Sequence, residues 1–364
     1  MPDTYHPNVL LLATALTGSD IQVSRISRKA AEQLRQTARK HGVMTLFHWC
    51  AQEGNVHGLT EADRDALNTT TRAQVIHDLL LNADTNKTLD LLASADIPAL
   101  LLKGTPVAFR YYKDTYLRTR CDTDLFIRTE DIQATAEVLS TNGYQISGLG
   151  QRTNASKQFC AIRSTSRGLG ATFDIHWRLS NRVLFNHILR FEECWTARQP
   201  LPELGSNAYT LSPAQLLLHA CIHRIAHGRN TERNRLLWLY DIDRITGSFS
   251  EEAFDQFLQL ALEKQVGTLC RDALVMSQYY FRTTYPEHYL AGLSRNHRRE
   301  PTARLIRAAK LRWVLADLMA LKTAREKLAF AGELLFPPRL AEQNRMLPRM
   351  RSWTAHLRSK IGWR

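Results

Sequence analysis

The sequence lacks long apolar runs. Its longest ones, Val9 to Leu16 and Ile97 to Leu102, fall far short of the roughly 18 residues that a membrane-spanning helix needs. We therefore expect neither a membrane span nor a membrane partner. The N-terminus has an acidic Asp3, and no basic leader precedes its first apolar run as in a secretory signal. These features predict a cytoplasmic protein.

Close cysteine pairs, internal repeats and low-complexity segments are also missing. The six cysteines are scattered along the chain, without the spacing of a zinc knuckle or a redox motif. We expect free thiols in a reducing compartment. With 44% apolar and 23% charged residues the composition is ordinary for a globular protein, so we do not expect a disordered or fibrous chain.

Basic residues outnumber acidic ones, and the net charge of +13 favours an anionic partner such as a nucleotide, a nucleic acid or an acidic peptide. Much of this excess lies in two clusters. The first comprises Arg295, Arg298, Arg299, Arg304, Arg307, Lys310 and Arg312, and the second Arg339, Arg345, Arg349, Arg351, Arg358, Lys360 and Arg364. We favour a solvated helix face and a basic end over a nucleic-acid patch, although Trp353 and Trp363 could stack on bases.

The pattern of apolar residues divides the chain into four parts. They are a helical N-terminal region (1–92), a core of alternating strands and helices (93–200), a helical C-terminal region (201–336) and a basic tail (337–364). In the core we expect strands at 98–102, 123–127 and 172–179, and helices at 106–112 and 130–141.

Several helix ends can be read from single residues. Asn142-Gly143 is typical of a C-cap after the helix at 130–141. Ser212, Pro213 and Gln215 supply an N-cap, a proline at the first helical position and a glutamine three residues after the cap. We expect this helix to end at Gly228 and another to follow at about 235–246.

Two aspartates lie one residue apart at the start of the strand predicted at 123–127, one just before it and one within it. Side chains two residues apart in a strand point to the same face of the sheet. Asp122 and Asp124 are therefore expected to project together, and Thr123, Leu125 and Ile127 to face the core. Neighbouring carboxylates repel each other, and a divalent cation is the usual way to neutralise them. The spacing therefore predicts a metal site.

The segment "ATFDIHWRL" at 171–179 alternates in the same way. Phe173, Ile175, Trp177 and Leu179 lie on one face, and Thr172, Asp174, His176 and Arg178 lie on the other. If the two strands are neighbours, Asp174 completes a three-carboxylate site suited to Mg²⁺ or Mn²⁺, which prefer oxygen ligands.

A phosphate site is predicted just upstream. Gly104 permits close approach of the backbone, and Thr105-Pro106 is typical of the start of a helix, where free N–H groups attract anions. Lys103 adds a positive charge beside them.

These segments carry a family resemblance. The order "LLKG", Arg118, "CDTDLFI" and "FDIHWRL" resembles the little-characterised bacterial nucleotidyltransferases of the DNA polymerase β-like superfamily, over about residues 75–250. The resemblance implies an α+β fold, in which a polymerase β-like core of mixed sheet and flanking helices lies between helical N- and C-terminal regions.

The resemblance also implies roles for individual residues. Asp122 and Asp124 would hold the metals, and Asp174 would join one of them and help to deprotonate the acceptor. Lys103, Gly104 and Thr105 would contact phosphates. Arg118 would either brace the carboxylates or neutralise triphosphate charge.

The expected activity is metal-dependent transfer of a nucleoside monophosphate. A nucleoside triphosphate, expected to be ATP, would donate it to a hydroxyl or similar group on a small molecule, a peptide or protein, or an RNA, releasing pyrophosphate. One alternative is a non-catalytic protein that uses the same fold and its basic surface to bind nucleic acid or peptide. Another is a phosphotransferase.

Other polar residues are candidates for substrate contact. His219, His223 and His227 recur every four residues on one helix, a spacing that can bind zinc, but the Glu of a metalloprotease helix is missing. We expect them to line an interdomain face or contact substrate. Asp241 and Asp243 diverge by about 200° on a helix, so they cannot share one ion. We expect Asp241 to approach the site or to anchor Arg or His side chains, and we count His176, His223, His227 and Asp241 as candidate substrate contacts.

Overall fold

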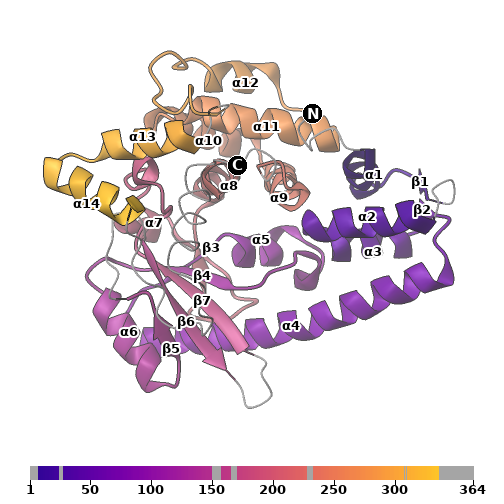
Figure 1. Cartoon of the computed structure of the whole chain (residues 1–364), viewed down its shortest axis with the longest axis horizontal. Helices are drawn as coiled ribbons and strands as arrows, with labels where there is room; N and C mark the ends of the chain where they lie inside the picture. The colour runs from indigo at the N-terminus through magenta and orange to yellow at the C-terminus, as the bar shows by residue number, and fades with distance from the viewer. Residues whose placement is uncertain are drawn as a thin grey trace.

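The computed structural model describes residues 7–23, 28–149, 157–164, 170–227, 233–306, 308 and 310–335. Its elements form an α+β arrangement in which a mixed sheet lies between a long helix, α4 (Glu61–Ser94), and a group of C-terminal helices (Figure 1). This confirms the expected fold class. None of the helices in these ranges combines the length and the apolar content that crossing a membrane requires.

The N-terminal part is helical, as predicted, with α1 (Pro7–Leu16), α2 (Arg28–Lys40) and α3 (Met44–Gln52) preceding α4. Thr60 begins α4 with a capping box, in which its side chain and that of Asp63 each accept a hydrogen bond from the other's backbone N–H. A short parallel pair, β1 (Ile21–Gln22) and β2 (Val56–His57), was not predicted.

The central sheet has seven strands in the order β5-β6-β7-β4-β3-β9-β8. Their bounds are β3 (Leu100–Leu102), β4 (Thr123–Phe126), β5 (Gln145–Ser147), β6 (Gln158–Ser164), β7 (Gly170–His176), β8 (Gln199–Pro200) and β9 (Tyr209–Thr210). The pairs β4·β7 and β3·β9 are parallel and the other pairs are antiparallel. Strands β3, β4 and β7 confirm the three predicted strands, whereas the other four were not predicted.

The two faces of the sheet face different helices. On β4, Leu125 packs with side chains of α4 and α6 (Ile132–Thr141), whereas Phe126 packs with α7 (Phe191–Thr196) and α8 (Pro213–His227). Asp124 therefore points to the α8 side of the sheet, because successive strand residues alternate. Thr123 faces α4, where its hydroxyl lies 2.9 Å from that of Thr85.

The helices around the sheet match most of the predicted boundaries. The remaining ones are α5 (Gly104–Tyr111), α9 (Leu236–Thr246), α10 (Glu251–Glu263), α11 (Gly267–Phe281), α12 (Glu287–Leu293), α13 (Lys310–Ala320) and α14 (Ala324–Leu335). Short 3₁₀ turns lie at Thr115–Leu117 and Val183–Phe185.

The caps predicted at Asn142 and at Ser212 with Gln215 are confirmed. Gly228, expected to end α8, lies outside the described residues.

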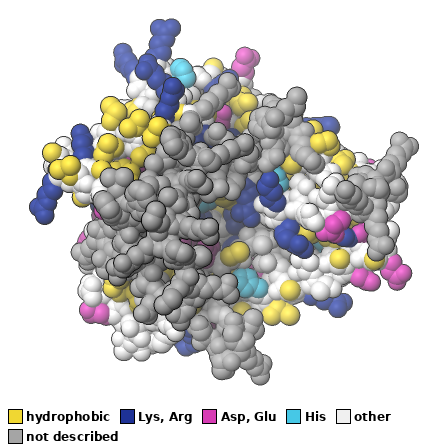
Figure 2. Space-filling view, viewed as in Figure 1, with side chains coloured by type: hydrophobic (Ala, Val, Ile, Leu, Met, Phe, Trp, Pro, Cys, Tyr) yellow, Lys and Arg dark blue, Asp and Glu magenta, His cyan; other side chains and the backbone are white. Residues whose placement is uncertain are grey.

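The first basic cluster differs from the expectation. Arg295, Arg298, Arg299 and Arg304 are exposed, as predicted, but they lie on turns between α12 and α13, so their placement on a helix face was wrong. Arg312 is exposed on α13. Figure 2 shows Lys and Arg side chains projecting from the upper edge of the molecule. Arg307, the side chain of Lys310 and the tail at 337–364 lie outside the described residues.

Candidate functional site

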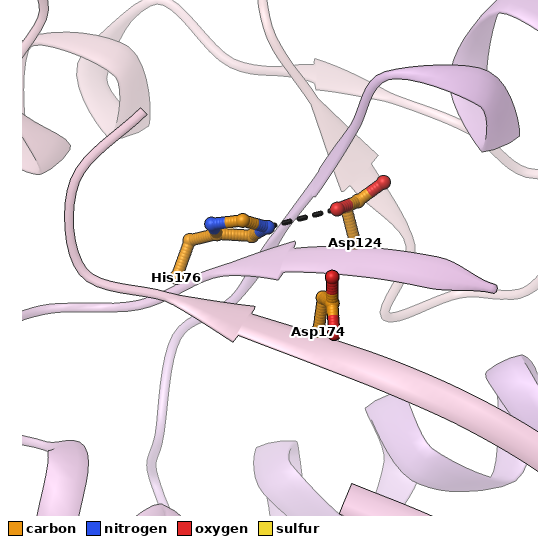
Figure 3. A group of neighbouring side chains, drawn as sticks. All are labelled: Asp124, Asp174 and His176. Carbon is orange, nitrogen blue, oxygen red and sulfur yellow. Dashed lines mark hydrogen bonds and ion pairs between the residues drawn. The ribbon is translucent and has the colours of Figure 1, made fainter. Parts of the chain in front are cut away.

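Asp124 and Asp174 lie opposite each other on adjacent parallel strands. In the register of β4 and β7, Asp124 pairs with Asp174 and Phe126 with His176. Figure 3 shows Asp124 on one of these strands and Asp174 and His176 on the other, with the His176 ring directed toward Asp124. The two strands are therefore neighbours, as the three-carboxylate hypothesis requires. Asp174 also accepts a hydrogen bond of 2.7 Å from Gln158 of β6, a contact that sequence reasoning missed because β6 was not predicted.

Lys103 reaches over the end of β3 to Asp124. Its Nζ lies 2.5 Å from Oδ1 of Asp124 and 3.4 Å from Nε2 of His176. Although Asp124 is buried, the charge on Lys103 and the hydrogen bond from His176 hold the pKa of its carboxyl far below the usual range. Asp124 is therefore ionised in the folded protein, and Lys103 and His176 both contact its carboxylate.

His176 is buried and donates to Asp124. Its Nε2 lies 2.8 Å from Oδ1 of Asp124, and because an ionised carboxylate only accepts, Nε2 carries the proton. Burial and the charge on Lys103 lower the pKa of His176, so the ring is neutral at pH 7. Its Nδ1 is buried and has no hydrogen-bond partner among the described residues.

Asp122 stands just before β4, beside this pair. Burial, followed by the charges of Asp124 and Asp174, raises the pKa of Asp122 to about 6, while Lys103 and Arg118 act in the opposite direction. The three predicted aspartates are therefore close enough to repel one another. Such repulsion is what a bound cation would relieve.

The donor set fits a divalent cation. Asp124, Asp174 and His176 bring ligand atoms within 4.8 Å of one another, and Asp122 lies outside this group. The two opposed carboxylates offer the oxygen ligands that Mg²⁺ and Mn²⁺ prefer. His176 would orient Asp124 through the hydrogen bond that its Nε2 donates.

Arg118 is held by the helical region. Its Nε and Nη2 donate to the two carboxylate oxygens of Asp241 on α9, at 3.2 Å and 2.6 Å, and Tyr112 donates to the same carboxylate at 2.7 Å. Of the alternatives for Asp241, these contacts match the anchoring of an arginine. The guanidinium also occupies the space beside Gly104, because a Cβ added there would clash with Nη1 of Arg118.

The family model described as "Uncharacterised nucleotidyltransferase" matches residues 27–282. This span includes the N-terminal helices from α2 onward, the whole sheet and helices α8 to α11. The chain belongs to this family of nucleotidyltransferases. No protein with a curated description matches the sequence.

In this nucleotidyltransferase, Thr105 belongs to a buried polar network. Its hydroxyl accepts a hydrogen bond of 3.0 Å from Nη1 of Arg120, whose Nη2 donates to Asp78 and Asn82 of α4. Sequence reasoning did not single out Arg120, because a lone arginine carries no motif. The network fixes the start of α5 against α4.

The histidines of α8 lie at different depths in this family member. His219 is buried, and burial followed by the charge on Lys103 lowers its pKa to about 3. The charges of Asp124 and His176 act on it as well, so it belongs to the same cluster. His223 packs edge-on against Trp238, with ring centroids 5.0 Å apart. The side chain of His227 lies outside the described residues.

Proposed function

We propose that this protein is a divalent-metal-dependent nucleotidyltransferase that moves a nucleoside monophosphate from ATP to a hydroxyl group of an acceptor. The observation that carries the proposal is the pairing of Asp124 with Asp174 across parallel strands, with Asp122 beside them. Family membership supports it. The acceptor would be a small molecule, a peptide or protein, or an RNA.

In the proposed reaction the acceptor oxygen bonds to the α-phosphorus. The bond from that phosphorus to the oxygen bridging to the β-phosphate breaks, and its electron pair leaves with pyrophosphate. Asp174 takes the proton of the acceptor hydroxyl. A bound Mg²⁺ or Mn²⁺ would supply charge for the phosphates.

The protein contributes position and positive charge. Asp122, Asp124 and Asp174 would hold the metal, and His176 fixes the orientation of Asp124 through its Nε2. The triphosphate would lie at the start of α5, where Lys103 and the guanidinium of Arg118 flank Gly104. The candidate substrate contacts His223, His227 and Asp241 lie on the helices that face this side of the sheet.

Nucleotide binding tests the site directly. Titration calorimetry with MgATP is expected to give binding that falls by about tenfold or more in Asp124→Asn and Asp174→Asn, because each loses a metal ligand. Asp65→Asn, which neutralises an exposed carboxylate on α4, is the matched control. Binding that is equally tight in all four proteins would overturn the proposal.

The position of the label separates nucleotidyl from phosphoryl transfer. The protein is incubated with ATP labelled at the α- or the γ-phosphate and with small-molecule, peptide and RNA fractions of a bacterial extract. Label transferred from the α-position with release of pyrophosphate supports the proposal. Transfer from the γ-position alone would make the protein a phosphotransferase.

The exposed arginines between α12 and α13 favour one alternative, a non-catalytic nucleic-acid binder. Such a protein would bind RNA or DNA with an affinity that falls steeply as salt is raised, and it would release no pyrophosphate. Measuring RNA affinity at low and high salt beside the labelled-ATP assay separates the two functions.

A further inference from the structure

Lys103 contacts the carboxylate of Asp124, which is one of the proposed metal ligands. Its ammonium lies 2.5 Å from Oδ1, and its side chain is 14% exposed. Two cations on one carboxylate oxygen repel each other, and the repulsion is strong where water is excluded. A divalent ion and the Lys103 ammonium therefore compete for Asp124.

The backbone holds Lys103 there at a cost. Its φ of 53° and ψ of −122° lie in a region that glycine favours and that other residues rarely adopt. Gly104 follows directly, so the chain has a glycine next to the strained position rather than at it. We infer that the contact of the Lys103 side chain with Asp124 offsets the backbone strain at this residue.

His219 is a buried side chain whose pKa is lowered by burial and then by the charge on Lys103. It lies on α8 with 2% of its surface exposed, and one ring nitrogen hydrogen-bonds to the backbone of Leu179. Its Nε2 is buried and has no partner among the described residues. Because the ring is neutral and its other nitrogen donates to the backbone, Nε2 carries a free lone pair. A buried acceptor left without a donor is costly, so a nearby ammonium would satisfy it.

We propose that Lys103 is a tethered cation that occupies the metal position on Asp124 until a divalent ion displaces it, and that Nε2 of His219 then accepts a hydrogen bond from the displaced ammonium. This inference rests on the proposed function, because it assumes that Asp124 and Asp174 bind a metal. The displaced ammonium would stay near the start of α5, where it adds positive charge for a phosphate.

Binding of Mn²⁺ without nucleotide tests the competition. The free Mn²⁺ signal in electron paramagnetic resonance gives the dissociation constant for the full chain. Lys103→Met is expected to lower this constant by about tenfold or more, because the competing ammonium is gone. Lys113→Met removes the same charge from an exposed side chain and is expected to change it by less than about twofold.

A double-mutant cycle tests the role of His219. His219→Phe is expected to weaken Mn²⁺ binding by about three- to tenfold while Lys103 is present, and to have little effect in Lys103→Met, where no ammonium needs an acceptor. Equal effects in both backgrounds would overturn the role of His219.

The outcomes separate this inference from the proposed function. If the wild type binds Mn²⁺ as tightly as Lys103→Met, the competition is refuted and the metal site stands. If neither protein binds Mn²⁺, the metal site fails and the competition fails with it. Circular dichroism checks folding, and Lys103→Gly, which removes the ammonium and relaxes the backbone, replaces Lys103→Met if that variant does not fold.

Discussion

Arg118 and Asp241 form a two-point ion pair between the segment that leads into β4 and helix α9, 123 residues further along the chain. Both side chains are buried, at 11% and 7% exposed. Coulombic attraction and hydrogen bonding to Asp241 outweigh burial and raise the pKa of Arg118 above its ordinary value. The pair joins the segment before the strand that carries Asp124 to the C-terminal helices.

Removing the charge of Asp241 tests this link. Asp241→Asn leaves the Arg118 guanidinium buried without its counter-charge, which is expected to lower the free energy of unfolding by about 3–5 kcal/mol. Urea denaturation measures the change. Asp255→Asn, at an exposed position on α10, serves as the control. A loss as small as that of the control would show that the pair contributes little.

Gly104 is expected to be intolerant of any side chain. In Gly104→Ala the new Cβ would clash with Nη1 of Arg118, so the guanidinium whose Nε and Nη2 bind Asp241 must shift. We expect a loss of about 1–3 kcal/mol of stability and weaker MgATP binding. Gly332→Ala on α14, where a Cβ meets nothing within 4 Å, is expected to be neutral or slightly stabilising. Unchanged melting and ATP affinity in Gly104→Ala would contradict this packing argument.

Thr105 can be tested for a structural role with an isosteric change. Thr105→Val removes the hydroxyl that accepts from Arg120 and leaves a buried donor unsatisfied. We expect the free energy of unfolding to fall by about 1–3 kcal/mol, with the affinity for MgATP nearly unchanged. If ATP affinity falls and stability does not, the hydroxyl contacts phosphate, as the sequence resemblance implies.

Asp122 makes stability depend on pH. Its pKa of about 6 in the folded protein lies above the ordinary 3.8, so protonation of its carboxyl stabilises the fold. This contribution is fully present below pH 3.8 and is lost as pH rises through about 6. The stability of the wild type relative to Asp122→Asn should therefore decrease between about pH 4 and pH 7. Urea denaturation of both proteins in EDTA at several pH values measures the difference, and a difference independent of pH would contradict the raised pKa.

Local sequence patterns predicted most of the core elements. A continuous apolar run predicted β3, alternation predicted β4 and β7, and the cap residues Asn142 and Ser212 marked helix ends. Strands β8 and β9 have two residues each and β5 has three, so they are too short to show a period. Strand β6 is longer, yet its sequence "QFCAIRS" does not alternate between apolar and polar residues.

The sequence by itself determined which residues could form the site, because residue type and spacing place Asp122, Asp124 and Asp174 on polar faces next to a glycine turn. It could not determine how they meet. The pairing of β4 with β7, about 50 residues apart, and the contact of Lys103 with Asp124 depend on long-range packing of the sheet against α4 and α8. Only the tertiary structure placed Asp174 opposite Asp124, brought Lys103 to the Asp124 carboxylate, and paired Arg118 with Asp241.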